Sequence, residues 1–139
     1  MGCERSRLLH ELWERAWRNP SLPPLVWAAV ILIGSSIPIP PAPESLAWFN
    51  FFGHADKVGH FGEYFIFALL LGTKYIIIEL PPKTAMRQVM LTVFAFALMD
   101  EAHQRWIPGR FPEALDYVVD ITGAFLGSMI LLKDKKRHA

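Results

Sequence analysis

An all-α fold is what the sequence predicts: an integral membrane bundle of four helices, preceded by an amphipathic helix at the membrane interface. The apolar residues come in four long runs, and the ionisable residues are bunched near the ends of these runs. Charged residues make up 19% of the 139-residue chain, against ~25% in soluble domains. The net charge is only +1, so nucleic acid is not expected as a partner.

Residues 1–21 are predicted to form the interfacial helix. Between residues 5 and 18, apolar residues repeat at helical spacing, and charged residues fill the opposite face. The apolar face holds Leu8, Leu9, Leu12, Trp13, Ala16 and Trp17. Leucine and tryptophan opposite arginine are typical of a helix that lies in the membrane interface. A surface helix packed on its own domain is the alternative.

The four apolar runs predict a transmembrane domain over residues 22–132. They cover residues 22–41, 58–80, 85–99 and 111–132. The first run is uncharged, with Pro23 and Pro24 suited to a helix start and Pro38 suited to a stop. Because a spanning helix needs ~20 residues, the third and fourth runs suffice only if their polar ends lie inside the bilayer.

The distribution of lysine and arginine predicts the orientation of the bundle. Eleven of the fourteen lie before the first run, around the junction of the second and third runs, or in the basic tail of residues 133–139. The positive-inside rule places those segments in the cytoplasm. Both termini are therefore expected to be cytoplasmic, with the opposite end of the bundle facing outward.

Three of the predicted helices carry polar residues at their outer ends, in each helix on one face. The spacing is i, i+4, i+7 in the second helix, i, i+3, i+4 in the third and i, i+4 in the fourth. The residues are Asp56, His60 and Glu63; Asp100, His103 and Gln104; and Asp116 and Asp120. Burying an aspartate at a helix centre in a bilayer costs ~2.5–3.5 kcal/mol, so these carboxylates need partners, water or a ligand.

Helical rise predicts that two of these carboxylates lie at the same depth. Asp100 and Asp120 each lie thirteen residues from a basic boundary residue, Arg87 and Lys133 respectively. Both should therefore sit ~20 Å across the apolar core of the membrane. The face of Asp116 and Asp120 continues through Gly123 and Gly127, a GxxxG pattern. Because this pattern lets helices approach closely, that face should meet another helix rather than lipid.

Four short motifs follow one another in this part of the chain. They are Asp56-Lys57-x-x-His60, Asp100-Glu101-x-His103-Gln104, Pro108-Gly109-Arg110, and Asp116 with Asp120 before Thr122-Gly123. Together they resemble the VanZ-like family of small bacterial integral membrane proteins, over about residues 25 to 130. The resemblance implies a multi-pass protein of the bacterial cytoplasmic (inner) membrane. The family's namesake is associated with resistance to the glycopeptide antibiotic teicoplanin.

The motif positions and the polar faces together predict an outward-facing pocket. We expect it to bind an anionic envelope component among the membrane lipids, such as a lipid phosphate or a lipid-linked cell-wall precursor, because arginine suits bidentate contact with phosphate. The candidate ligand-binding residues are Asp56, Lys57, His60, Glu63, Asp100, Glu101, His103, Gln104, Arg105, Arg110, Asp116 and Asp120. A structural polar network that fixes helix register is the alternative.

A membrane-embedded hydrolase or transferase acting on a lipid or cell-wall intermediate is the second hypothesis. His60 or His103 would act as general base, oriented by Asp100 or Glu101. No cofactor or metal is clearly implied, and His60, His103 and Asp100 are the candidate ligands if a metal assists. Proton or ion movement is a third hypothesis, disfavoured because four helices without a repeat leave little room for alternating access.

Overall fold

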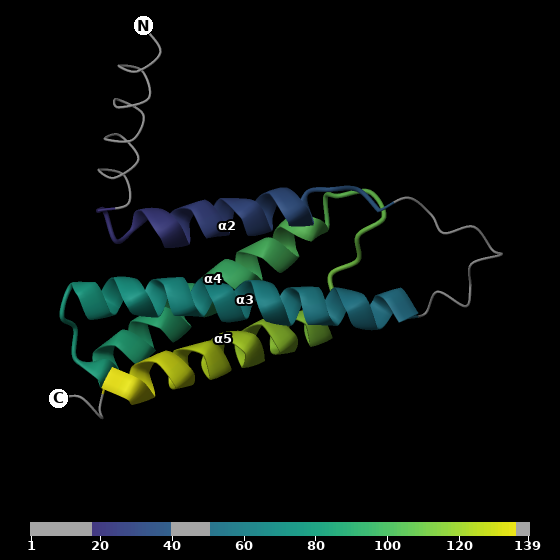
Figure 1. Ribbon diagram of the computed structural model, residues 1–139. Coiled ribbons are helices and arrows are strands. Elements are labelled where there is room, and N and C mark those ends of the chain that lie inside the picture. Colours follow the sequence, from purple (N-terminus) through teal and green to yellow (C-terminus); the bar gives the residue numbers. More distant parts are fainter. Residues whose placement is uncertain (1–17, 40–50, 136–139) are drawn as a thin grey trace, which may run out of the picture.

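The computed structural model describes residues 18–39 and 51–135, and these residues form four helices and no strand. The helices are α2 (Leu22–Ser35), α3 (Phe51–Ile77), α4 (Pro82–Gln104) and α5 (Ala114–Lys135). Successive helices run in opposite directions (Figure 1). The all-α expectation is confirmed for this part of the chain. Most of the predicted interfacial helix and the last four residues of the basic tail lie outside the described residues.

All four helices differ in extent from their predicted runs, and α2 and α3 differ most, by six residues or more at one end. Helix α2 ends at Ser35, six residues before the end of the predicted run, because the prolines from Pro38 onward cannot continue a helix. Helix α3 begins at Phe51, seven residues before the predicted run. Nothing between Phe51 and Val58 breaks a helix, since polar residues are compatible with one and proline is not. The polar motif of α3 therefore lies inside the helix and not at its first turn.

One described helix is long and apolar enough to cross a membrane, by length and composition alone. It is the stretch Ala114–Lys133 of α5. Helix α2 is apolar but has only 14 residues, which is ~21 Å of helix. Helices α3 and α4 have 27 and 23 residues. They are long enough to cross a membrane, but their polar residues lower their hydropathy too far for this test.

Helices α3 and α5 form the central pair, and their contact is the most extensive in the fold. Two glycines of α5 bring the backbones together. A Cβ on Gly123 would collide with the backbone oxygen of Phe61, and one on Gly127 would lie 2.7 Å from the backbone oxygen of Phe65. The GxxxG expectation is therefore confirmed, with α3 as the partner helix.

The remaining helices cover the central pair. Helix α4 packs on α3 and α5, and α2 packs on α3 with a smaller contact to α4. The rings of Tyr64 and Phe67 of α3 meet edge to face, and both lie at a tilt to the ring of Phe96 of α4. The buried apolar core consists of Ile31, Tyr64, Phe67, Ala68, Leu71, Val89, Val93, Ala97 and Ala124.

The connection between α4 and α5 is fastened to the segment that follows α2. The backbone N–H of Ile39 donates to the carbonyl of Pro108 at 3.2 Å. Gly109 has φ +78°, a conformation that residues with a side chain rarely adopt. A Cβ on this glycine would also collide with the carbonyl oxygen of Ile39. This junction closes the end of the bundle at which the polar motifs meet.

Candidate functional site

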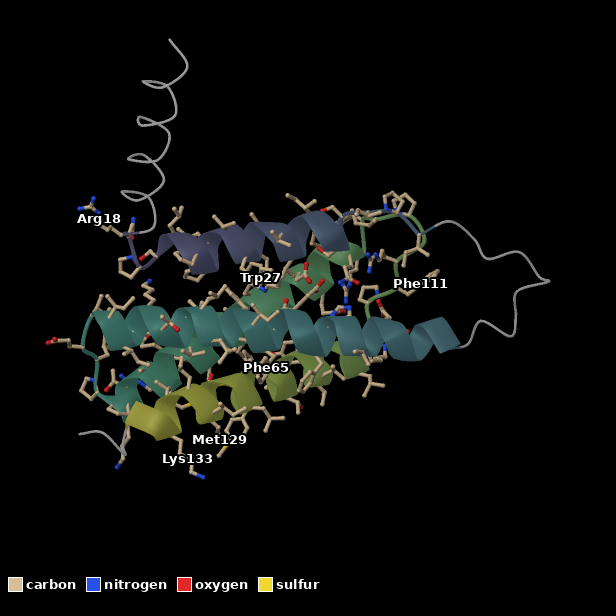
Figure 2. All side chains as sticks on the ribbon, viewed as in Figure 1. Arg18, Trp27, Phe65, Phe111, Met129 and Lys133 are labelled. Carbon is tan, nitrogen blue, oxygen red and sulfur yellow. The ribbon has the colours of Figure 1, made fainter. Side chains whose placement is uncertain are left out.

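Buried polar side chains from all four helices gather at the end of the bundle that carries the α4–α5 connection. In Figure 2, oxygen and nitrogen atoms of side chains lie between the helices near the labelled Phe111, away from the labelled Met129 and Lys133. The buried members are Ser35, His60, Asp100, Glu101, Gln104, Asp116 and Asp120. We call this group the polar cluster. Its residues are those expected from the sequence, apart from Ser35.

A histidine–aspartate pair joins α3 to α5 within the polar cluster. His60 Nδ1 lies 3.0 Å from Asp120 Oδ1, and both side chains are buried. The other ring nitrogen, Nε2, lies 4.0 Å from Asp56 Oδ1. Asp120 can reach His60 because it lies one helical turn before Gly123, where α5 touches α3. The His60 ring is thus held between two carboxylates, one buried and one exposed.

Asp100 accepts hydrogen bonds from two other helices. Ser35 Oγ of α2 donates to Asp100 Oδ1 at 2.6 Å, and the Tyr64 hydroxyl of α3 donates to Oδ2 at a longer 3.5 Å. Only 1% of Asp100 is exposed. The carboxylate therefore connects three helices and has protein donors for both of its oxygens.

Lys57 of α3 forms ion pairs with two acids at the start of α5. Its Nζ donates to Asp116 and, at 2.7 Å, to Glu113 Oε2. Lys57 therefore pairs with two acids from the start of α5 and the residue before it, and it does not line the cavity described below.

Arg110 and His103 fasten the α4–α5 connection to the end of α2. Arg110 donates from Nη2 to the carbonyl of Gly34 at 2.9 Å and from Nε to that of Ile37 at 3.3 Å. His103 Nε2 lies 3.0 Å from Ser36 Oγ. Arg110 uses only two of its five N–H donors in these contacts, so it can still contact a ligand.

Three buried polar atoms of the cluster have no hydrogen-bond partner among the described residues. They are Glu101 Oε1, Gln104 Nε2 and Asp120 Oδ2. The second oxygen of Glu101 accepts from the backbone N–H of Glu113 at 3.2 Å. Leaving a buried polar atom unpaired costs ~1–3 kcal/mol, and more for a charged group. Unpaired atoms of this kind require an explanation, such as water, an ion or a ligand.

The polar cluster borders a cavity of about 140 Å³. Asp100 and Gln104 of α4 and Arg110 of the connection lie on its wall, opposite residues of α2 and α3. The lining residues are Gly34, Ser35, Asp56, Gly59, His60, Glu63, Asp100, Gln104 and Arg110. The wall thus combines carboxylates with the donors Arg110 and Gln104.

The sequence predictions and the geometry differ at several residues. Arg105 is exposed and does not line the cavity. The residue that contacts His60 is Asp120, and the predicted partners Asp100 and Glu101 bond elsewhere. Helix spacing could not find this pair, because it depends on how α3 and α5 rotate against each other. The hydrogen-bond partners Ser35, Tyr64 and Glu113 were also outside the predicted site.

The candidate metal ligands also differ from those expected. His103 and Asp100 bond to serines of the α2 end. Among the described residues, His60 instead groups with Glu101 and Asp120, or with Asp56 and Asp116, at distances that suit one metal ion. The first group is buried throughout.

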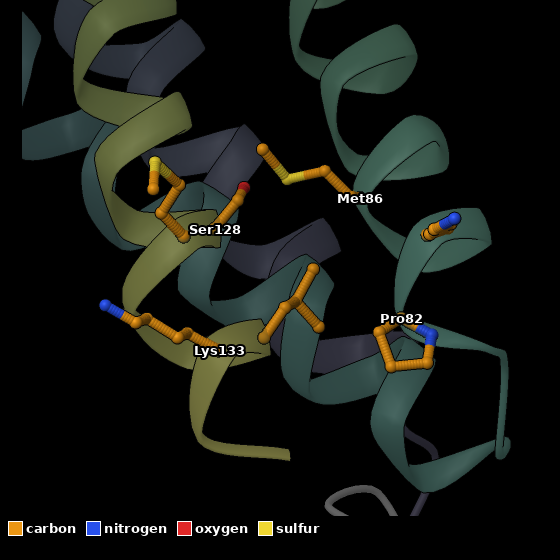
Figure 3. A pocket seen from close by; sticks show the side chains of 7 residues that line it. Pro82, Met86, Ser128 and Lys133 are labelled. Atoms are coloured by element: carbon orange, nitrogen blue, oxygen red, sulfur yellow. The ribbon is translucent and has the colours of Figure 1, made fainter. Parts of the chain in front are cut away.

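A second cavity lies at the other end of the bundle, between the start of α4 and the end of α5 (Figure 3). Its volume is about 360 Å³, and its wall is mostly apolar. Lys83 and Lys133 lie on its rim, and Ser128 has a buried hydroxyl without a described partner. None of the predicted site residues lines it, so it is separate from the polar cluster.

Comparison with known proteins gives one match. The family described as VanZ/LLP1 matches residues 8–133, which extends the resemblance into the N-terminal segment. No curated protein and no solved structure matches the chain significantly.

Proposed function

The chain belongs to the VanZ/LLP1 family, and from this premise we propose a multi-pass protein of the bacterial inner membrane with both termini in the cytoplasm. The distribution of side chains supports this proposal. Polar groups are buried inside the bundle, while large apolar side chains lie on its outside, such as Leu25, 65% exposed, and Ile130, 59% exposed. Many other large apolar side chains of the described residues are exposed as well, whereas soluble monomers rarely expose large contiguous apolar patches.

The proposed orientation predicts which loop is reachable from outside the cell. In a Cys3→Ser background, we expect a membrane-impermeant maleimide to label Trp106→Cys in intact cells and Lys83→Cys only after lysis. Trp106 follows α4 at the end of the bundle that holds the polar cluster, and Lys83 is the second residue of α4, at the opposite end. Labelling of Lys83→Cys alone in intact cells would contradict the orientation, and recovery of both variants without a membrane would contradict the membrane location.

We further propose that the cavity of the polar cluster binds the anionic headgroup of a membrane lipid or lipid-linked cell-wall precursor. The observation that carries this proposal is that Arg110 and Gln104 line the same cavity and both have N–H donors available. Both residues line the cavity, Arg110 has unused donors, and the Gln104 Nε2 is buried without an acceptor. Phosphate oxygens would satisfy both groups, since charge-assisted bonds to arginine are strong.

The acids on the same wall restrict which anion can bind. Three acids, Asp56, Glu63 and Asp100, line the cavity as well. Their negative charges oppose the binding of an anionic ligand. Asp100 is partly compensated by Ser35 and Tyr64, and Asp56 faces His60. The proposal therefore requires positive charge near His60, either on the ring or on a bound cation, in addition to Arg110.

Lipid titration tests the headgroup proposal. In nanodiscs, we expect saturable enrichment of phosphatidylglycerol over phosphatidylcholine around the wild-type protein, measured by native mass spectrometry. Arg110→Gln should weaken this preference by about 10-fold or more, because a bond to a charged group contributes ~1.5–3 kcal/mol. Arg105→Gln is the matched control, since Arg105 is exposed in the same connection, and it should retain the preference.

Two results would contradict the headgroup proposal. One is the absence of any saturable preference for the anionic lipid. The other is an equal loss in Arg110→Gln and Arg105→Gln, which would indicate unspecific attraction to charge. A lipid-linked cell-wall precursor offered in the same assay distinguishes it from an ordinary phospholipid.

The His60–Asp120 pair supports a second candidate function, catalysis on the bound lipid. Asp120 contacts Nδ1, and the ring of His60 borders the cavity. An imidazole oriented in this way can act as a general base toward a bound substrate. The same mass-spectrometric assay separates the two functions, because a binding protein returns the headgroup intact and a hydrolase or transferase returns an altered one.

An effect on glycopeptide susceptibility would follow from either function if the lipid is a cell-wall precursor. Comparing the teicoplanin sensitivity of cells with and without the protein tests this effect.

A further inference from the structure

We propose that His60, Glu101 and Asp120 form a binding site for a divalent transition-metal ion, with Zn²⁺ or Mn²⁺ as the expected occupant. The three residues come from α3, α4 and α5, and each offers one ligand atom within 4.8 Å of the other two. All three are buried, with exposed fractions of 6%, 8% and 0%. The site lies in the fold where three separate helices meet, so its geometry depends on the whole bundle.

Two unpaired carboxylate oxygens provide an independent indication of a cation. Glu101 Oε1 and Asp120 Oδ2 are buried and have no hydrogen-bond partner among the described residues. A buried carboxylate oxygen without a donor is costly, because the charge loses its hydration and gains nothing. A single cation between these residues would compensate both acids at once.

No lysine or arginine among the described residues forms an ion pair with Glu101 or Asp120. Lys57 is bonded to Asp116 and Glu113, and Arg110 donates to backbone carbonyls of the α2 end. Among the described ion pairs, Glu101 has none and Asp120 has only His60. The protein thus assembles two acids and one imidazole without supplying a permanent positive charge.

The ligand chemistry and geometry favour a transition metal. Imidazole nitrogen with carboxylate oxygen suits Zn²⁺ and Mn²⁺, whereas Ca²⁺ and Mg²⁺ prefer oxygen alone. His60 Nδ1 and Asp120 Oδ1 are 3.0 Å apart, which is close to the ~3.0–3.5 Å between neighbouring ligands that each lie ~2.0–2.2 Å from one ion. Three protein ligands leave a coordination position open, and His60 borders the cavity.

The alternative group around His60 suits a metal less well. Asp56 is exposed, and Asp116 is already bonded to Lys57. A metal there would have to displace that lysine. Glu101 belongs only to the buried group, and Asp56 belongs only to the other group. Substituting each of them therefore tells the two groups apart.

Metal titration of the purified full-length chain tests the site. The protein is stripped with EDTA in detergent without added lipid, and MnCl₂ or ZnCl₂ alone is titrated by calorimetry. We expect one saturable site per chain in the wild type and in Asp56→Asn. Glu101→Gln should weaken it by more than about 100-fold, since even substitutions outside the ligand shell cost ~10–100-fold.

Thermal melting separates loss of the metal from loss of the fold. Without metal, Glu101→Gln should melt at or above the wild-type temperature, because it removes one of two neighbouring buried charges. Metal should raise the melting temperature of the wild type and leave that of Glu101→Gln unchanged. If Glu101→Gln fails to fold, Asp120→Asn takes its place, and it should likewise lose metal binding and the stabilisation by metal.

Three outcomes would overturn the metal site. They are no saturable binding of either ion to the wild type, equal binding by Glu101→Gln, and loss of binding in Asp56→Asn alone. The metal titration contains no anionic lipid, so its result does not depend on whether the lipid proposal is correct. Arg110→Gln should bind metal like the wild type, so failure of the lipid proposal and failure of the metal site are separate results.

Discussion

Lys57→Met is expected to destabilise the protein by roughly 2–3 kcal/mol. Lys57 holds the charge of Asp116, which is only 3% exposed, and removing one partner of a buried pair leaves an uncompensated charge. A fully buried pair costs ~3–5 kcal/mol to break. The expected loss is smaller here because 23% of the Lys57 side chain remains exposed to solvent. Unfolding in mixed micelles with increasing sodium dodecyl sulfate measures the change in free energy.

Three further variants attribute the loss to the buried charge. Lys83→Met removes an exposed lysine that has no described ion pair, and it should change the unfolding free energy by less than ~0.5 kcal/mol. Glu113→Gln should cost under ~1 kcal/mol, because Glu113 is 56% exposed. The double variant Lys57→Met, Asp116→Asn should regain part of the stability, since no charge is then left unpaired. A Lys57→Met protein as stable as Lys83→Met would refute the assigned role.

Much of the fold follows from the pattern of apolar runs. The four helices, their order and the proline-marked start of α2 were all predicted. The start of α3 was not, because hydropathy marks where a helix is apolar and not where it begins. Phe51 to Lys57 is helical although it is polar in part. Helix ends are set by backbone hydrogen bonds and by proline, which a hydropathy run does not report.

The candidate site was predictable one helix at a time, and its pairings were not. Helical spacing placed Asp56 with His60 and Asp116 with Asp120 because those relations lie within one helix. The contact of His60 with Asp120 depends on the rotation of α3 against α5, which Gly123 and Gly127 set. Glu101 was expected to orient a histidine, and the fold instead turns one of its oxygens toward the backbone of Glu113.

Gly109→Ala is expected to lower stability by about 2–4 kcal/mol and to abolish the lipid preference of the cavity. Two costs add at this position. The backbone has φ +78°, which costs an ordinary residue ~1–2 kcal/mol, and the new Cβ would collide with the carbonyl oxygen of Ile39. Relieving the collision separates the connection from the α2 end, which removes the Ile39–Pro108 hydrogen bond and moves Arg110 away from Gly34.

Gly109→Asn separates the two costs, because asparagine tolerates positive φ better than alanine yet carries the same Cβ. We expect Gly109→Asn to lose lipid preference and most of the stability that Gly109→Ala loses, as measured by the nanodisc and denaturation assays. Gly62→Ala is the control, since a Cβ there meets nothing within 4 Å and alanine favours a helix by ~1 kcal/mol. If Gly109→Asn had the stability and lipid preference of the wild type, backbone conformation alone would require the glycine. If Gly109→Ala had them, the junction with Ile39 would not position Arg110. The expected pattern instead makes the Pro108-Gly109-Arg110 motif a positioning device, in which the absent side chain of the glycine determines where the arginine lies.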